Sequence, residues 1–295
     1  MEVQCPTCSA KFVVPETITV ATCPYCGTTF ELESKEKVGD HFFFPPIGKD
    51  AAGLLLKFIS REYGAPADIV DARVKEKVLH YVPVHFFYIH GNLQGSTAEE
   101  VMLIGVPAVG KFKELLRDYP FPVRGKRFFD ENIVKKGKYY EPEISKEEAE
   151  KEAVSKVVAA IREEARDSGD WFSEDRLVLD VHYQGLVHYP VWEVHYEYGG
   201  EEFYGFVDGA DGRVIEAKYP MTSEARKKAG VLGGGVLGAG IIAGIVFAAT
   251  GGLWGFLGGF IPGLVGAAPI LFKSAHRIQT TGQIRRVYEH IHFKP

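Results

Sequence analysis

All four cysteines of the chain lie near its start, as Cys5-Pro-Thr-Cys8 and, after 14 further residues, Cys23-Pro-Tyr-Cys26. A C-x2-C pair presents two sulfur atoms from one tight turn, and two such pairs complete a tetrahedron around one Zn2+ with bonds of ~2.3 Å. We therefore expect Cys5, Cys8, Cys23 and Cys26 to bind one zinc ion. Four thiolates leave no coordination position for water, so this zinc is expected to be structural.

The residues around the cysteines alternate between apolar and polar, as in Lys11–Val14 and Thr28–Leu32, which favours short strands beside each C-x2-C turn. On its paired C-P-x-C knuckles, the segment 1–34 resembles a zinc ribbon. Because a segment this short can build only a small hydrophobic core, the metal is expected to supply part of the folding free energy. Two disulfides or a redox C-x-x-C are the alternatives, but a redox motif needs a βαβ context that is absent here.

A second stretch, from Ala229 to Phe272, contains no Asp, Glu, Lys or Arg. It is about twice the ~20 residues that a membrane-spanning helix needs, so we expect a transmembrane hairpin over 229–272. Its spans are expected at 229–249 and 253–272, with Thr250-Gly251-Gly252 as the turn. The alternative is a Gly-rich helical hairpin in a soluble core, where each glycine would cost ~1 kcal/mol.

Basic residues flank this stretch on both sides, which favours a cytoplasmic location for both termini by the positive-inside rule. The first residues do not form a signal peptide, and thiolate ligands persist in a reducing compartment, which favours the same location. We expect a multi-pass protein of the cell membrane with two spans. The flanking residues are Arg226, Lys227, Lys228, Lys273 and Arg277.

Glycines within the stretch recur every four residues, about one helical turn, and so form smooth grooves along the helices. Two interpretations follow: the grooves pack the two spans of one hairpin together, or they also join hairpins of neighbouring chains into a homo-oligomer. The rows are Gly230, Gly234 and Gly238; Gly240 and Gly244; and Gly251, Gly255, Gly259 and Gly263.

The middle of the chain is expected to hold two related α+β modules, at 51–140 and 141–220, after a linker at 35–50. Each module has an amphipathic helical pattern followed by an aromatic-rich β pattern. The second continues as a β-meander with hairpin turns at Gly199-Gly200 and Asp211-Gly212. Its helix begins with Ser145 and Glu148 in a capping-box spacing.

Residues 143–217 resemble the PepSY domain, on Ile144-Ser-Lys-Glu-Glu-Ala149 at a helix start and Val207-Asp-Gly-Ala-Asp-Gly-Arg-Val214 in the strands. The family's Thr before the glycine is Asp211 here. The resemblance implies a helix-plus-antiparallel-sheet module that binds proteins or peptides. The order of segments is also similar to that of prokaryotic membrane proteins with an N-terminal zinc ribbon.

Distinctive aromatic and proline residues occupy the β patterns of both modules. One interpretation places them in the sheet core and at strand entry, and the other makes them an aromatic groove for a peptide. The candidates are Tyr81, Pro83, Tyr189, Pro190 and Trp192.

Catalytic patterns are weak. Gly105–Lys111 is one residue short of a P-loop, and Phe112 stands where Ser or Thr must hold Mg2+. The histidines of the two modules do not form a compact set of three on one strand face, so we expect core or surface histidines. We therefore predict a protein that is not an enzyme, with a nucleotide-binding enzyme as a competing interpretation.

Charge argues against a nucleic-acid partner. The chain has a net charge of −5, and in segment 1–34 Lys11 is the one basic residue against four glutamates, whereas phosphate binding needs Lys and Arg. The segment 273–295 is basic and is expected to lie on anionic lipid headgroups. Its apolar stripe would be Ile278, Ile284, Val287 and Ile291.

With 46% hydrophobic and 25% charged residues, the chain is neither disordered nor fibrous. We expect an α+β protein with a zinc ribbon, repeated helix-plus-sheet modules and a membrane hairpin. Its expected role is a non-enzymatic protein-binding or scaffold factor on the cytoplasmic face, with membrane lipid and an unidentified protein as partners. The competing class is an oligomeric membrane-remodelling or pore-forming protein built on the hairpin.

Overall fold

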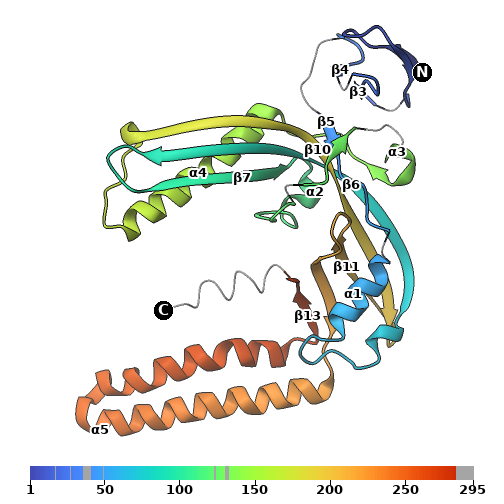
Figure 1. The fold of residues 1–295 in the computed structure, drawn as a ribbon. Coiled ribbons are helices and arrows are strands. Elements are labelled where there is room, and N and C mark those ends of the chain that lie inside the picture. The colour runs from blue at the N-terminus through green and yellow to red at the C-terminus, as the bar shows by residue number, and fades with distance from the viewer. Residues whose placement is uncertain are drawn as a thin grey trace. The chain divides into compact units, whose positions relative to one another are not determined.

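The computed structural model describes residues 1–283 except 17, 27, 36–40, 49, 123 and 130–132, and it does not describe the side chains of Thr250 and Lys273 (Figure 1). The chain divides into two units that each draw on separate stretches of sequence. The first unit comprises Met1–Lys49, Val78–Glu193 and Val207–Arg213; the second comprises Asp50–Lys77, Val194–Phe206 and the chain from Val214 onward.

The N-terminal part of the first unit consists of two small antiparallel hairpins, and each carries one C-x2-C sequence in its turn. Their core is built from apolar side chains, with Phe30 fully buried, and from two of the cysteines. It also receives Val134 and Tyr139 from later in the same unit. The strands are β1 (Glu2–Gln4) with β2 (Lys11–Val13), and β3 (Val20–Thr22) with β4 (Thr29–Glu31).

Two very long strands, β6 (Arg73–Leu93) and β10 (Leu177–Tyr198), contribute to both units. In the first unit, β6 forms an antiparallel hairpin with β7 (Glu99–Pro107), and the two long strands pair with each other. Three shorter strands complete this part. They are β5 (His41–Phe43), parallel to β10; β8 (Arg127–Phe128), antiparallel to β5; and β9 (Lys138–Tyr139), parallel to β6.

Helix α4 (Lys146–Asp167) covers one face of the β6–β7 hairpin. Its predicted capping box is present: the Glu148 N–H donates to the Ser145 hydroxyl at 3.2 Å, and the Ser145 N–H donates to the Glu148 carboxylate at 3.0 Å. The helix presents mostly small residues to the sheet, so the backbones approach closely. Its fully buried residues are Ala149, Ala153, Val157, Ile161 and Ala165.

In the second unit, helix α1 (Ala51–Ile59) packs on a sheet of β11 (Glu201–Asp208), β12 (Val214–Pro220) and β13 (Ile278–Thr281), which continues from β10. The predicted turn between β10 and β11 is confirmed, since Gly199 and Gly200 both have positive φ, 61° and 80°. The side chain of Leu55 lies against Gly205, where a Cβ would come within 2.6 Å of it.

Both long strands follow the same order of elements. Helix α1 and the turn η1 (Ile69–Asp71) precede β6, and helix α4 and the turn η2 (Glu174–Arg176) precede β10. This order agrees with the predicted repeat of helix-plus-sheet modules, which stays a prediction. Two further short helices are α2 (Gly110–Lys113) and α3 (Ile133–Lys136).

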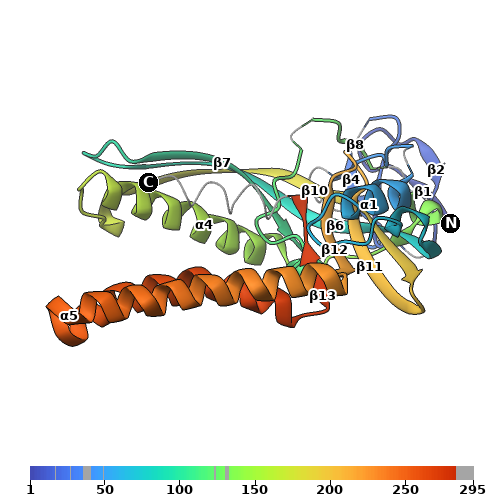
Figure 2. The same ribbon diagram turned by 90° about the horizontal axis from the view of Figure 1, so that it is seen from below.

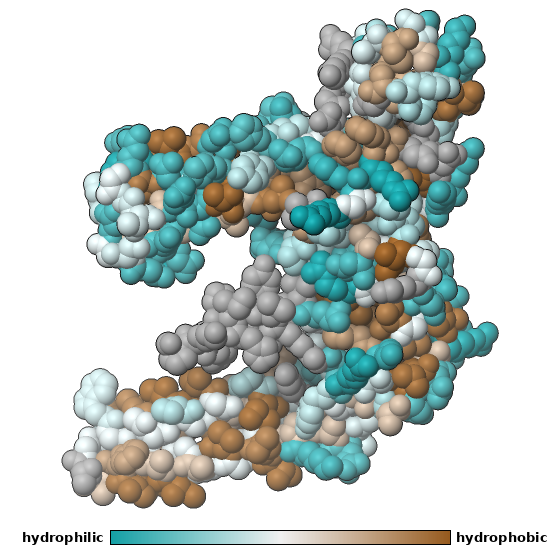
Figure 3. Space-filling view, viewed as in Figure 1, coloured by the Kyte–Doolittle hydropathy of each residue, from teal (hydrophilic) through white to brown (hydrophobic). Residues whose placement is uncertain are grey.

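The apolar stretch forms α5 (Ser223–Ala275), a helical hairpin that breaks at Gly252 (φ 55°, ψ −138°), within the predicted turn. Its two arms, Ser223–Ala249 and Gly251–Phe272, are each long and apolar enough to cross a membrane. The arms run side by side in Figure 1 and overlie one another in the turned view of Figure 2. Apolar and weakly polar side chains cover the surface of the hairpin that faces the viewer in Figure 3.

Candidate metal centre and neighbouring sites

The four cysteine sulfurs form one compact cluster. The Sγ atoms of Cys5 and Cys26 lie 3.7 Å apart, those of Cys8 and Cys23 lie 3.6 Å apart, and all four are within 4.8 Å of one another. A regular tetrahedron with metal–sulfur bonds of ~2.3 Å has edges of about 3.8 Å. A disulfide would need ~2.05 Å, and all four cysteines are free thiols here. The cluster therefore fits one tetrahedral metal ion.

Short backbone hydrogen bonds give each knuckle its shape. The Cys5 N–H donates to the Ala10 carbonyl at 2.9 Å, and the Cys23 N–H donates to the Thr28 carbonyl at 2.8 Å, at equivalent places in the two hairpins. The Thr7 N–H points at the Cys5 sulfur at 3.4 Å, as an amide stabilising a thiolate does. Ser9 closes the first turn with a φ of 62°.

The thiols differ in their surroundings. Cys5 and Cys23 are buried, whereas Cys8 and Cys26 are exposed, so the cluster lies just under the surface of the two N-terminal hairpins of residues 1–34, which we refer to as the ribbon. A hydrogen bond with the Thr28 side chain lowers the pKa of Cys26 to about 6. The thiolate, rather than the thiol, is the form of cysteine that binds a metal ion.

Residues 139–141 connect the ribbon to the sheet within the first unit. Tyr139 packs against the ribbon core, and its hydroxyl lies 3.3 Å from Nε2 of His188. Burial raises the pKa of Glu141, while a hydrogen bond from the Thr19 backbone of the ribbon opposes that rise. No motif marks these residues in the sequence, because the contact is made between segments more than 100 residues apart.

Beneath this contact lie two buried imidazoles. The rings of His41 and His188 are 4.8 Å apart, and His41 stacks on Phe129 at 4.0 Å. Burial lowers the pKa of His41 to about 3 and that of His188 well below its usual range, so both rings are neutral. Among the described residues, the cysteines make up the sole group of three or more His, Cys, Asp or Glu side chains whose ligand atoms lie close enough to hold one metal ion.

A chain of polar side chains joins Tyr140, His80, Glu193 and Lys111. The hydroxyl of Tyr140 lies 2.9 Å from Nδ1 of His80, whose Nε2 lies 2.9 Å from the Glu193 carboxylate. Lys111 pairs with the same carboxylate at 3.1 Å. Burial, with Lys111 nearby, lowers the pKa of His80 to about 4. The lysine of the P-loop-like segment thus binds a carboxylate of its own chain.

The loop before Lys111 is similarly engaged. The Gly110 N–H donates to the Glu143 carboxylate at 2.7 Å, and the helix that follows has only four residues. A nucleotide phosphate in a P-loop would accept hydrogen bonds from the Gly110 N–H and from Lys111, and both groups already bind carboxylates of this chain. This arrangement gives the nucleotide-binding interpretation no support.

The aromatic and proline candidates lie mostly in the interior. Tyr81, Pro83, Tyr189 and Pro190 are buried, and Trp192 is half-buried. The Tyr189 hydroxyl donates to the buried carboxylate of Asp208 at 2.6 Å, and the Tyr119 hydroxyl donates to the same oxygen. These positions favour the sheet-core interpretation over the peptide groove.

The glycines of α5 fall into two groups. A Cβ on Gly240, Gly244, Gly255, Gly259 or Gly263 would lie 2.1–2.8 Å from backbone atoms of the opposite arm. These glycines therefore pack the arms of one hairpin together. A Cβ added to Gly234, Gly238 or Gly251 would meet no other atom within 4 Å. A Cβ added to Gly230 would meet only the Ser274 side chain, at 3.8 Å.

The basic C-terminal segment is described only in part. Ile278 begins β13 and is half-exposed, with 52% of its surface accessible. Ile284, Val287 and Ile291, the rest of the predicted apolar stripe, lie outside the described residues.

Comparisons with known proteins found no match: no protein-family model, no curated protein and no solved structure matches this chain. The resemblances to a zinc ribbon and to the PepSY domain therefore rest on the motifs themselves.

Proposed function

We propose that this chain is a non-enzymatic scaffold or protein-binding factor, anchored in a membrane by α5, with a zinc ribbon on the cytoplasmic side. The observation that carries the proposal is the attachment of both hairpin ends to one sheet edge. Pro220 at the end of β12 pairs with Ile278 at the start of β13, and the Met221 N–H donates to the Arg277 carbonyl at 2.7 Å. Such a hairpin enters and leaves the bilayer on the same side.

Charge supports the cytoplasmic side. Arg226, Lys227 and Lys228 lie in the first turns of α5, and Arg277 follows its last turn. Positive residues next to spans concentrate on the cytoplasmic face. The far end of the hairpin carries no charge and exposes Trp254, and tryptophan is enriched at both membrane–water interfaces.

The ribbon offers a surface suited to a protein partner. Val13 and Tyr25 are 75% and 71% exposed, and the same small domain also exposes four acidic residues, Glu2, Glu16, Glu31 and Glu33. An exposed aromatic anchor on an acidic domain fits a basic protein segment. Zinc is the proposed metal, because four thiolates in tetrahedral array are its preferred structural site.

Topology is tested with reporter fusions in cells. Green fluorescent protein at either terminus should fluoresce, and alkaline phosphatase inserted after Gly251 should be active, because the hairpin tip reaches the opposite side. An active phosphatase at either terminus would contradict the proposal.

The docking role is tested by purifying cross-linked complexes of the full-length protein. Tyr25→Ala and Val13→Glu leave the cysteines intact and should remove the partner while one zinc per chain is retained. Cys23→Ser with Cys26→Ser should remove both. Partners that remain bound to all of these variants would exclude the ribbon as the docking surface.

A second candidate, an oligomeric membrane assembly, is favoured by the open groove of Gly234 and Gly238. Cross-linking in membranes separates the two proposals. Discrete multimers that disappear with Gly234→Leu and Gly238→Leu, but persist with Gly251→Leu at the tip, would support the assembly. A monomer throughout would exclude it.

A further inference from the structure

Segments that are distant in sequence meet where the hairpin α5 leaves the sheet of the second unit. The loop after α1 reaches the start of α5 (Figure 1), and the Thr222 N–H donates to the Gly64 carbonyl at 2.8 Å. The Tyr63 hydroxyl donates to the Ala225 carbonyl at 3.5 Å. The end of the hairpin lies beside them, because β12 and β13 pair at its base. We call residues 61–64, 221–228 and 276–278 the collar of the hairpin.

The loop fits tightly against the helix. Gly64 has a φ of 76°, and a Cβ there would lie 2.8 Å from the side chain of Met221 and 2.9 Å from that of Ala225. A glycine at this position therefore lets the loop approach the helix so closely. The Tyr219 hydroxyl also donates to the Tyr63 carbonyl at 3.3 Å. Tyr63 is thus held next to the first turns of α5.

Two large side chains of the collar face solvent although their backbones are fixed. Tyr63 is 59% exposed, and Ile278 is 52% exposed. Tyrosine is enriched at membrane–water interfaces, because its ring is apolar and its hydroxyl is polar. An exposed tyrosine and an exposed isoleucine at the base of two helices of membrane length therefore fit the interfacial layer of a bilayer.

The helix places the first basic residue of the collar at the level of lipid headgroups. Arg226 precedes Ala229, where the uncharged stretch begins, by three residues. This separation is about 4.5 Å along a helix that rises ~1.5 Å per residue. The headgroup layer on each side of a bilayer is roughly 5–8 Å thick. Arg226 therefore lies within that layer when the uncharged stretch lies in the hydrocarbon.

The cations of the collar differ in their partners. Lys228 pairs with Glu224 at 2.7 Å, and Arg277 pairs with Glu201 at 2.9 Å. Arg226 has no such carboxylate within the described part of the chain, and its Nε atom is buried without a hydrogen-bond partner. A buried donor of a charged group is destabilising when it lacks an acceptor, so a ligand that supplies an acceptor is favoured.

We propose that the collar binds the headgroup of an anionic phospholipid, with the Arg226 guanidinium on the phosphate and Tyr63 in the interfacial layer. This inference rests on the proposed anchoring of α5 in a membrane. A guanidinium matches two oxygens of a phosphate with parallel hydrogen bonds. Lys227, which is exposed and next in the chain, adds to the attraction for anionic lipids. A zwitterionic lipid carries an ammonium group that these cations repel, so the anionic lipid is preferred.

Native mass spectrometry of the full-length protein, incorporated into nanodiscs, tests this preference. The nanodiscs contain phosphatidylglycerol and phosphatidylcholine in equal amounts, and the lipids that stay bound after release are counted. We expect phosphatidylglycerol to be retained about tenfold more than phosphatidylcholine, because its charge-assisted hydrogen bonds are not opposed by a second cation. Equal retention of the two lipids would overturn the proposal. A protein that does not enter nanodiscs at all would overturn the membrane anchoring itself, and with it this inference.

Matched variants locate the lipid. Arg226→Gln should remove most of the preference for phosphatidylglycerol, and Arg226→Lys, which keeps the charge but not the two parallel hydrogen bonds, should keep part of it. Lys228→Gln should have a smaller effect, because Glu224 already neutralises that ammonium. Lys113→Gln is the control, since Lys113 pairs with Glu152 in the first unit, and it should bind lipid as the parent protein does. A preference that is unchanged in an Arg226→Gln protein with the circular dichroism of the parent would overturn the assignment.

Discussion

Neighbouring glycines in the second arm of α5 should respond to alanine with opposite signs. A Cβ on Gly259 would lie 2.3 Å from the backbone nitrogen of Gly244 on the other arm, whereas a Cβ on Gly258 meets nothing within 4 Å. Ordinary contact begins at 3.4 Å, so Gly259→Ala must push the arms about 1 Å apart. The obstacle is backbone, which cannot rotate away as a side chain can.

The structure sets the size of the difference. Overpacking of this kind costs about 1–3 kcal/mol. Alanine is favoured over glycine in a helix by up to ~1 kcal/mol, and both variants receive that gain. Gly258→Ala should therefore be neutral or stabilising and Gly259→Ala destabilising, with about 1–3 kcal/mol between them. Gly263→Ala, whose Cβ would lie 2.5 Å from the Gly240 Cα, should behave like Gly259→Ala.

Equilibrium unfolding of the full-length protein by SDS in mixed micelles, followed by tryptophan fluorescence, measures this difference. Trp254 lies near the tip of the hairpin, and with Trp171 and Trp192 of the first unit replaced by phenylalanine its emission alone reports on that region. Equal shifts of the midpoint for Gly258→Ala and Gly259→Ala would refute the packing of the two arms through Gly259.

Three further predictions concern the first unit. Metal analysis should find one zinc per chain, and Cys8→Ser should lower that content; a zinc content unaffected by the substitution would contradict the site. Asp208→Ala should lower the free energy of unfolding by about 3 kcal/mol, because it leaves two tyrosine hydroxyls and the N–H groups of Ala210 and Asp211 without their acceptor. Each such group costs ~1–3 kcal/mol before the structure relaxes. Urea denaturation measures the change, and the control Arg117→Ala, which removes an exposed ion pair, should alter the free energy of unfolding little. Acidification from pH 7 to pH 5 should lower the free energy of unfolding by about 2 kcal/mol through His41 alone, because the unfolded imidazole takes up a proton near pH 6.5 and the folded one not until about pH 3. The stability that is present at neutral pH is therefore lost as the pH falls, and His41→Phe should reduce the slope of the denaturation midpoint against pH. An unchanged slope would mean that His41 does not titrate in this way.

Patterns local in sequence predicted much of the structure. The cysteine spacing identified the sulfur cluster, the capping-box spacing placed the start of α4, and the Gly-Gly pair placed a hairpin turn. Each of these depends on a few neighbouring residues whose chemistry restricts the backbone. The break in α5 at Gly252 was predictable for the same reason.

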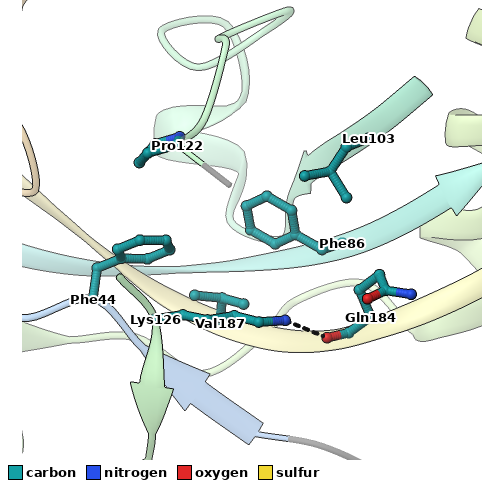
Figure 4. Close-up of a pocket in the computed structure, with 7 residues that line it drawn as sticks. All are labelled: Phe44, Phe86, Leu103, Pro122, Lys126, Gln184 and Val187. Atoms are coloured by element: carbon teal, nitrogen blue, oxygen red, sulfur yellow. Dashed lines mark hydrogen bonds between the residues drawn. The ribbon is translucent and has the colours of Figure 1, made fainter. Parts of the chain in front are cut away.

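Contacts between distant segments were not predictable. His41–Phe43, in the segment expected to be a linker, forms strand β5 beside residues 186–188 of β10. Three residues are too few to show a strand period, and their partner lies more than 140 positions away. The contact of residues 139–141 with the ribbon and the small cavity beside Phe86 in Figure 4 depend on similar long-range pairings.

The pairing of β12 with β13 ties completion of the sheet to the time course of synthesis. Between Pro220 and Ile278 the ribosome must add the whole of the apolar hairpin. At ~5–20 residues per second, this takes roughly 3–11 seconds, during which β12 is an open sheet edge. Strand β13 can close that edge only after the hairpin has folded back. A nascent chain whose hairpin fails to insert therefore displays an unpaired edge beside an apolar segment, the features by which quality-control factors distinguish an unfinished protein from a finished one.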